Sequence, residues 1–191
     1  MSDEPVLGPG AGPLDDATEV SSWRPVYRLL SDLDDEIARV YAENGLDDLK
    51  PTWVLEILRL HARGPMTIAE LARSVGRTHS ALSQKVAAMR TAGWLETTPG
   101  PDARSKKVTL TAKAERVAAL LDAEWRATQA AIDEIESEIP YPLTRVVDDI
   151  RAVLGRQSFH DRITARLAAD QSWSALRRAR GLPPAGDASR S

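Results

Sequence analysis

The segment of residues 67–110 constrains the fold most, because its hydrophobic period changes from that of helices to that of strands. Its first half contains two short stretches with helical spacing of the apolar residues, 67–76 and 78–93. They are joined at Gly76, a residue that readily ends a helix. The second stretch has a polar and basic outer face. Two short helices with such a turn between them form the helix-turn-helix pattern.

The second half of this segment predicts a β-hairpin. Residues 94–98 and 106–110 read as short strands, and the sequence PGPDARS between them is rich in turn-forming residues. The turn and the second strand carry one arginine and two lysines, so the hairpin has a basic tip. A hairpin directly after a helix-turn-helix is a wing.

Helical patterns flank this segment on both sides. Prolines and glycines separate them, as at Asn44-Gly45, Gly64-Pro65 and Pro140. We therefore predict a mainly α protein with a small two-stranded β-wing. The first twenty residues are rich in Gly, Pro and Asp, and we expect them to be disordered. The expected flanking helices span about residues 22–45, 51–63, 112–139, 142–155 and 158–169.

The charge distribution indicates a polyanionic partner. The net charge of the chain is −3, and residues 1–50 carry 12 acidic and 4 basic side chains. Residues 73–107 carry 7 basic and only 2 acidic ones. Positive charge is therefore concentrated on the helix-turn-helix and the hairpin, which is the electrostatic footprint of a nucleic-acid-binding protein.

Several function classes are excluded or disfavoured by composition. The absence of cysteine excludes disulfides, thiolate zinc sites and a cysteine nucleophile. The three histidines lie far apart, and we find no nucleophile–base pair or phosphate loop, so we predict neither an enzyme nor a bound cofactor or metal. The N-terminus lacks the pattern of a signal peptide, and no apolar run reaches the roughly 18 residues of a membrane span. We expect a cytoplasmic protein without a membrane partner.

The segment from Thr78 to about Glu115 resembles the MarR family of bacterial regulators. The resemblance is carried by three motifs in fixed order, Gly93-Trp94-Leu95, Asp102-Ala103-Arg104-Ser105-Lys106 and Val108-Thr109-Leu110-Thr111. The helical order before and after them fits the family over about residues 22–169. The resemblance implies a homodimeric transcriptional repressor that binds near-palindromic double-stranded DNA. It also implies release from that operator by a small aromatic effector.

We expect DNA contacts from both parts of the winged segment. If Leu82, Val86 and Met89 face the core, the polar side of the second helix faces solvent and can reach base edges or phosphate. By the resemblance, Arg104 enters the minor groove and Asp102 orients it. The alternatives are an ordinary solvated helix face and a charged turn, and His79 fits a surface histidine equally well. The expected contact residues are Arg77, Thr78, His79, Ser80, Ser83, Gln84, Lys85, Arg104, Ser105 and Lys106.

Apolar residues at helical spacing in the flanking helices indicate a dimer interface, because they extend beyond what a small winged lobe can cover. The alternative is that they form core, which we expect for Trp53 and Trp94. His61 and His160 are expected to be structural or surface residues. The predicted interface residues are Leu29, Leu33, Leu121, Trp125, Ile132, Ile135, Val146 and Ile150.

Together these patterns predict one winged helix domain over residues 21–169. Within it we expect a DNA-binding lobe at about 50–111 and a dimerisation lobe of helices at about 22–45 and 112–169. We expect residues 170–191 to form a basic and mostly disordered tail. The alternative function is a winged-helix module that binds another protein instead of DNA, which would lack a basic recognition face.

Overall fold

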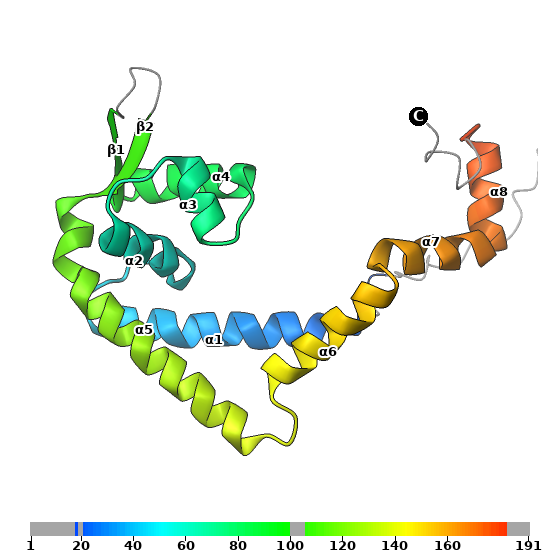
Figure 1. The fold of residues 1–191 in the computed structure, drawn as a ribbon, viewed down its shortest axis with the longest axis horizontal. Helices are drawn as coiled ribbons and strands as arrows, with labels where there is room; N and C mark the ends of the chain where they lie inside the picture. The colour runs from blue at the N-terminus through cyan, green and yellow to red at the C-terminus, as the bar shows by residue number, and fades with distance from the viewer. Residues whose placement is uncertain (1–17, 19–20, 100–105, 183–191) are drawn as a thin grey trace, which may run out of the picture. The chain divides into compact units, whose positions relative to one another are not determined.

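The structure, a computed structural model, describes residue 18 and residues 21–99 and 106–182 (Figure 1). It is mainly helical with one two-stranded antiparallel sheet, which confirms the predicted fold class. The chain divides into two compact units, with the boundary between Glu124 and Trp125, inside a long helix. The elements are α1 (Arg24–Glu43), the 3-10 turn η1 (Pro51–Trp53), α2 (Val54–Arg63), α3 (Ile68–Ser74), α4 (His79–Thr91), β1 (Leu95–Pro99), β2 (Lys106–Leu110), α5 (Ala112–Glu138), α6 (Leu143–Arg156), α7 (Phe159–Ala169) and α8 (Gln171–Ala179).

Local capping explains where the helix-turn-helix begins and turns. The Thr67 hydroxyl accepts a hydrogen bond from the Glu70 backbone N–H at 3.2 Å, and the Glu70 carboxylate accepts one from the Thr67 N–H at 2.8 Å. This reciprocal pair forms a capping box at the start of α3. Gly76 adopts a φ of 66° after α3, and Thr78 caps α4 through the Ala81 N–H. A positive φ at this position favours glycine, which has no Cβ.

The hairpin pairs β1 with β2 from Leu95 opposite Leu110 to Pro99 opposite Lys106. A single further pair, which the sequence did not predict, joins Met66 to the central residue of β2. The Val108 N–H donates to the Met66 carbonyl at 2.7 Å, and the Met66 N–H donates to the Val108 carbonyl at 3.1 Å. The wing is therefore tied to the connection between α2 and α3.

The core of the first unit lies between α2, α3, α4, the hairpin and the first half of α5. Trp53 and Trp94 are both buried in it, as expected from the sequence. The Lys113 ammonium lies 4.0 Å from the centre of the Trp94 ring. The largest fully buried side chains of the described residues are Trp94, Ile57, Leu71, Leu82, Met89, Leu121, Glu56, Val54 and Val108.

Helix α1 belongs to the first unit and packs on the rest of it near the C-terminal end of the helix. The Tyr41 side chain is buried, and its hydroxyl donates to the Glu124 carboxylate at 2.7 Å. Burial raises the pKa of Tyr41, and the bond to the Glu124 carboxylate raises it further. Tyr41 is thus a neutral hydrogen-bond donor that joins α1 to α5. The rest of α1 exposes most of its apolar residues.

The second unit contains the end of α5 and helices α6, α7 and α8. Of its described residues, up to Leu182, none is buried. Helix α8 corrects the prediction of a mostly disordered tail after residue 169. The Asp170 side chain caps it by accepting from the Trp173 N–H at 3.0 Å, and Gly181 follows with a φ of 63°. The remaining tail residues and the predicted N-terminal extension, residue 18 apart, lie outside the described residues.

Candidate nucleic-acid interface

Helix α4 presents one buried and one exposed side. Leu82, Val86 and Met89 are almost completely buried, as the sequence pattern predicted. Most of the polar residues predicted to contact DNA lie at the opposite side or at the N-terminal end of the helix. Ser83 is half-buried, and the exposed ones are Arg77, Thr78, His79, Ser80 and Gln84. The structure thus brings these six residues together on one surface, and their contact with DNA stays a prediction.

Lys85 does not lie on this surface, so the expectation for it was wrong. Its ammonium donates to both carboxylate oxygens of Glu56, at 3.0 and 3.2 Å, and to the Thr52 carbonyl at 2.6 Å. Glu56 is 0% exposed and the Lys85 side chain only 20%. The long stem of Lys85 carries the charge inward, where it compensates a carboxylate that would otherwise be buried alone.

Glu56 was not predicted to have a role. A signal was present, because residue 56 lies three positions after Trp53 and four before Leu60, on the buried face of α2. A carboxylate at such a position requires a buried cation or donor. The pair of Glu56 and Lys85 therefore connects α2 to the middle of α4, the helix expected to enter the major groove.

The two lysines of β2 differ in exposure. Lys106 is exposed, whereas Lys107 is half-buried and lines a cleft of about 500 Å³ with Arg63, Arg73 and Glu70. Hydrogen bonds from Thr67 lower the pKa of the Glu70 carboxyl, and the charges of Lys107 and Arg73 lower it further. Asp102, Arg104 and Ser105 lie outside the described residues, so their predicted roles at the hairpin tip stay predictions.

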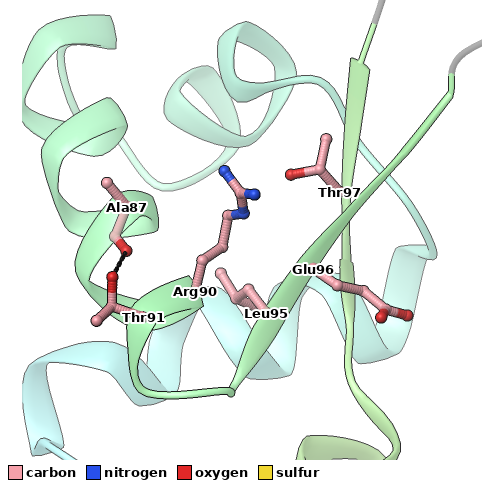
Figure 2. A pocket seen from close by; sticks show the side chains of 6 residues that line it. All are labelled: Ala87, Arg90, Thr91, Leu95, Glu96 and Thr97. Carbon is pink, nitrogen blue, oxygen red and sulfur yellow. Dashed lines mark hydrogen bonds between the residues drawn. The ribbon is translucent and has the colours of Figure 1, made fainter.

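A second cleft, of about 580 Å³, lies between the C-terminal half of α4 and β1 (Figure 2). The Arg90 side chain extends from α4 into this cleft toward Thr97 on β1, while the Glu96 carboxylate points away from it. The Thr91 hydroxyl donates to the Ala87 carbonyl at 3.1 Å. Arg90 is one of the seven basic residues of the segment 73–107, and no separate role was predicted for it. The residues that line the cleft are Ala87, Arg90, Thr91, Leu95, Glu96 and Thr97.

The predicted dimer interface needs one correction. Leu121 is 0% exposed within the first unit, so it belongs to the core of a single chain. The first half of α5 packs on the winged lobe. An apolar stripe on a helix has the same sequence pattern whether it packs in a core or in an interface. Trp125 and Ile150 are half-buried, and the residues that expose apolar surface are Leu29, Leu33, Ile132, Ile135 and Val146.

Two further findings concern other kinds of site. Among the described residues, no three or more potential ligand side chains gather in a way that could hold a metal ion. No helix in the described part of the chain is long and apolar enough to cross a membrane. His61 pairs with Glu115 at 3.0 Å and His160 lies 3.4 Å from Asp161, both at the surface.

Comparison with known proteins supplies a family for the winged segment. The family model of the winged helix DNA-binding domain matches residues 51–114. This range includes α2, α3, α4 and both strands, and it confirms the winged helix predicted from the sequence. A search of curated proteins found no match.

Solved structures of regulators are similar to the chain. The S. aureus MepR–DNA complex has a TM-score of 0.50 at 13% identity, over 72% of this chain and 96% of MepR, and therefore shares the fold. The M. tuberculosis regulator MosR in complex with DNA has 25% identity and a TM-score of 0.49, over 70% of this chain and 93% of MosR. A MarR protein from Peptoclostridium difficile has 17% identity and a TM-score of 0.49, over 80% of this chain and 99% of that protein.

Proposed function

We propose, from the match of residues 51–114 to the winged helix DNA-binding domain family, that the chain is a MarR-type transcription regulator. It binds double-stranded DNA, with α4 as the recognition helix and the β1–β2 hairpin as the wing. The observation that carries the proposal is the arrangement of α4 within this domain. Its apolar side is buried and the side with Ser80 and Gln84 is exposed, and such side chains can read base edges.

The charge distribution supports this function over enzymatic activity. The segment of residues 73–107 has an excess of basic residues, although the chain as a whole is acidic. Such a concentration favours phosphate contacts, which supply most of the affinity for DNA. We propose a regulator that acts in the cytoplasm and has no catalytic role of its own.

The regulator is proposed to work as a homodimer on a near-palindromic operator. Two copies of α4 then enter successive major grooves, one helical turn apart. Support comes from the exposed apolar residues of α1 and of the second unit, which a two-fold pairing would cover. By analogy with the MarR family, the regulator is a repressor that a small aromatic compound releases from DNA.

The second candidate function is a winged-helix module that binds another protein. It is less well supported, because such a module does not need a basic segment at the recognition helix and the hairpin. A selection of genomic fragments with the purified full chain distinguishes the two. Enrichment of a few fragments that share a near-palindromic sequence supports the regulator, and uniform recovery of fragments contradicts it.

The role of α4 is tested on the selected site. Gln84→Ala removes one exposed amide, and we expect a loss of roughly 1–3 kcal/mol on the operator with little change on unrelated DNA. Gln157→Ala, which changes an exposed glutamine after α6, is the matched control and should leave both affinities unchanged. Equal losses on operator and unrelated DNA would contradict base recognition by Gln84.

A further inference from the structure

We propose that the cleft between α4 and β1 holds a sugar–phosphate strand of DNA, and that Arg90 binds one of its phosphates. The inference rests on the proposed function and adds a contact that neither the sequence pattern nor the family match assigns. It concerns a single cleft with a single basic side chain directed into it (Figure 2).

A recognition helix in the major groove and a wing at the adjacent minor groove lie on opposite sides of one DNA strand, because the sugar–phosphate backbone separates the two grooves. That strand must therefore pass between the helix and the wing. The cleft lies at this place, with the last turns of α4 on one side and β1 on the other.

The chemistry of the cleft suits a phosphate group. An arginine has five N–H donors in a planar fork, which matches phosphate oxygens well. Arg90 is exposed, and its guanidinium makes no ion pair or hydrogen bond within the part of the chain that the structure describes. Thr97 offers a hydroxyl on the opposite wall, and the small side chain of Ala87 leaves space for the strand.

No nearby carboxylate neutralises the positive charge of Arg90 within the described part of the chain. The Glu96 carboxylate points away from the guanidinium, on the other side of β1. The cleft near α3 is less suited to a phosphate, although it contains Arg63, Arg73 and Lys107. There the Glu70 carboxylate is fixed by the capping box and already interacts with the charges of Lys107 and Arg73.

The test measures affinity and its salt dependence for Arg90→Gln on the selected operator and on unrelated DNA. We expect a loss of roughly tenfold on both, because a phosphate contact carries no sequence information. The plot of log affinity against log salt has a negative slope, and its magnitude should decrease by about 0.9 for each protomer. Arg145→Gln, at an exposed arginine of α6 that pairs with Asp149, is the matched control and should change neither quantity.

Operators with one neutral methylphosphonate at a time locate the phosphate. The unaltered protein should lose affinity when the substitution lies on the strand between the contacted major groove and the adjacent minor groove. The Arg90→Gln variant should lose no affinity when the methylphosphonate lies at that position. At every other contacted phosphate it should lose as much affinity as the unaltered protein does. Retained sensitivity at every position, or an unchanged salt slope, overturns the assignment while the proposed function stands. Failure of the unaltered protein to bind any DNA overturns both. Equal thermal unfolding of the variant shows that its fold is intact.

Discussion

The buried ion pair of Glu56 and Lys85 leads to a prediction about stability. Lys85→Met keeps the apolar stem and removes the charge, so it leaves a fully buried carboxylate without its cation. Breaking a buried pair in this way costs about 3–5 kcal/mol. The ammonium makes three hydrogen bonds and its side chain is only 20% exposed. Because a domain has only about 5–15 kcal/mol of stability, the loss should be a large part of the total.

The double variant Glu56→Leu with Lys85→Met distinguishes two contributions to stability. One is the cost of leaving the Glu56 carboxylate without a partner, and the other is the net contribution of the ion pair. Replacement of both charges by apolar groups of similar size is often neutral or stabilising. We therefore expect the double variant to regain most or all of the stability lost in Lys85→Met. Its operator affinity should stay below that of the unaltered protein, since the directed bonds between α2 and α4 are gone and only apolar packing orients α4.

The free energy of unfolding of both variants is measured by urea unfolding followed by tryptophan fluorescence. Fluorescence reports on the pair because Trp53 and Trp94 are buried in the same unit. Lys106→Met, at an exposed lysine of β2, is the control and should change the free energy of unfolding by less than about 0.5 kcal/mol. A loss below about 1 kcal/mol for Lys85→Met would contradict the role of Lys85 as the cation that the buried Glu56 carboxylate requires. So would a double variant that is as unstable as the single one.

Three further predictions concern the wing, redox chemistry and assembly. Arg104→Ala should weaken operator binding by roughly 1–3 kcal/mol, the scale of one good groove contact; an unchanged gel-shift affinity at fixed salt would remove the wing arginine from the interface. Mild peroxide should leave DNA binding intact, since the chain has no cysteine to oxidise; a loss that a thiol reductant reverses would contradict this. Sedimentation at low micromolar concentration should give a homodimer, and truncation after Ile139 should abolish it; a stable 20.9 kDa monomer that still binds the operator would disprove the dimer.

Local patterns predicted much of the fold correctly. The apolar spacing of residues 67–76 predicted α3, and the apolar residues of α4 predicted its buried side. The change from helical to alternating period predicted β2 with its observed bounds and β1 to within one residue at each end. These features depend on neighbours within a few positions, so the sequence contains the information directly.

Long-range features could not be predicted in the same way. The inward turn of Lys85 depends on Glu56, which is 29 residues away in the sequence. Leu121 lies on a helix whose apolar stripe serves the core in its first half and is exposed further on. The pairing of Met66 with Val108 is a single pair, and no run of alternating apolar and polar residues around Met66 predicts a strand there. In each case the outcome is decided by tertiary packing, which overrides local preference.

The most direct test of DNA recognition by two copies of α4 is hydroxyl-radical footprinting of the full chain on its selected operator. We expect two protected regions related by two-fold symmetry, with centres about one helical turn of DNA apart. Protection should extend into the minor groove at the outer side of each region, where the wing lies. A footprint confined to one region without symmetry, or no protection at concentrations that saturate the gel shift, would contradict recognition by two copies of α4.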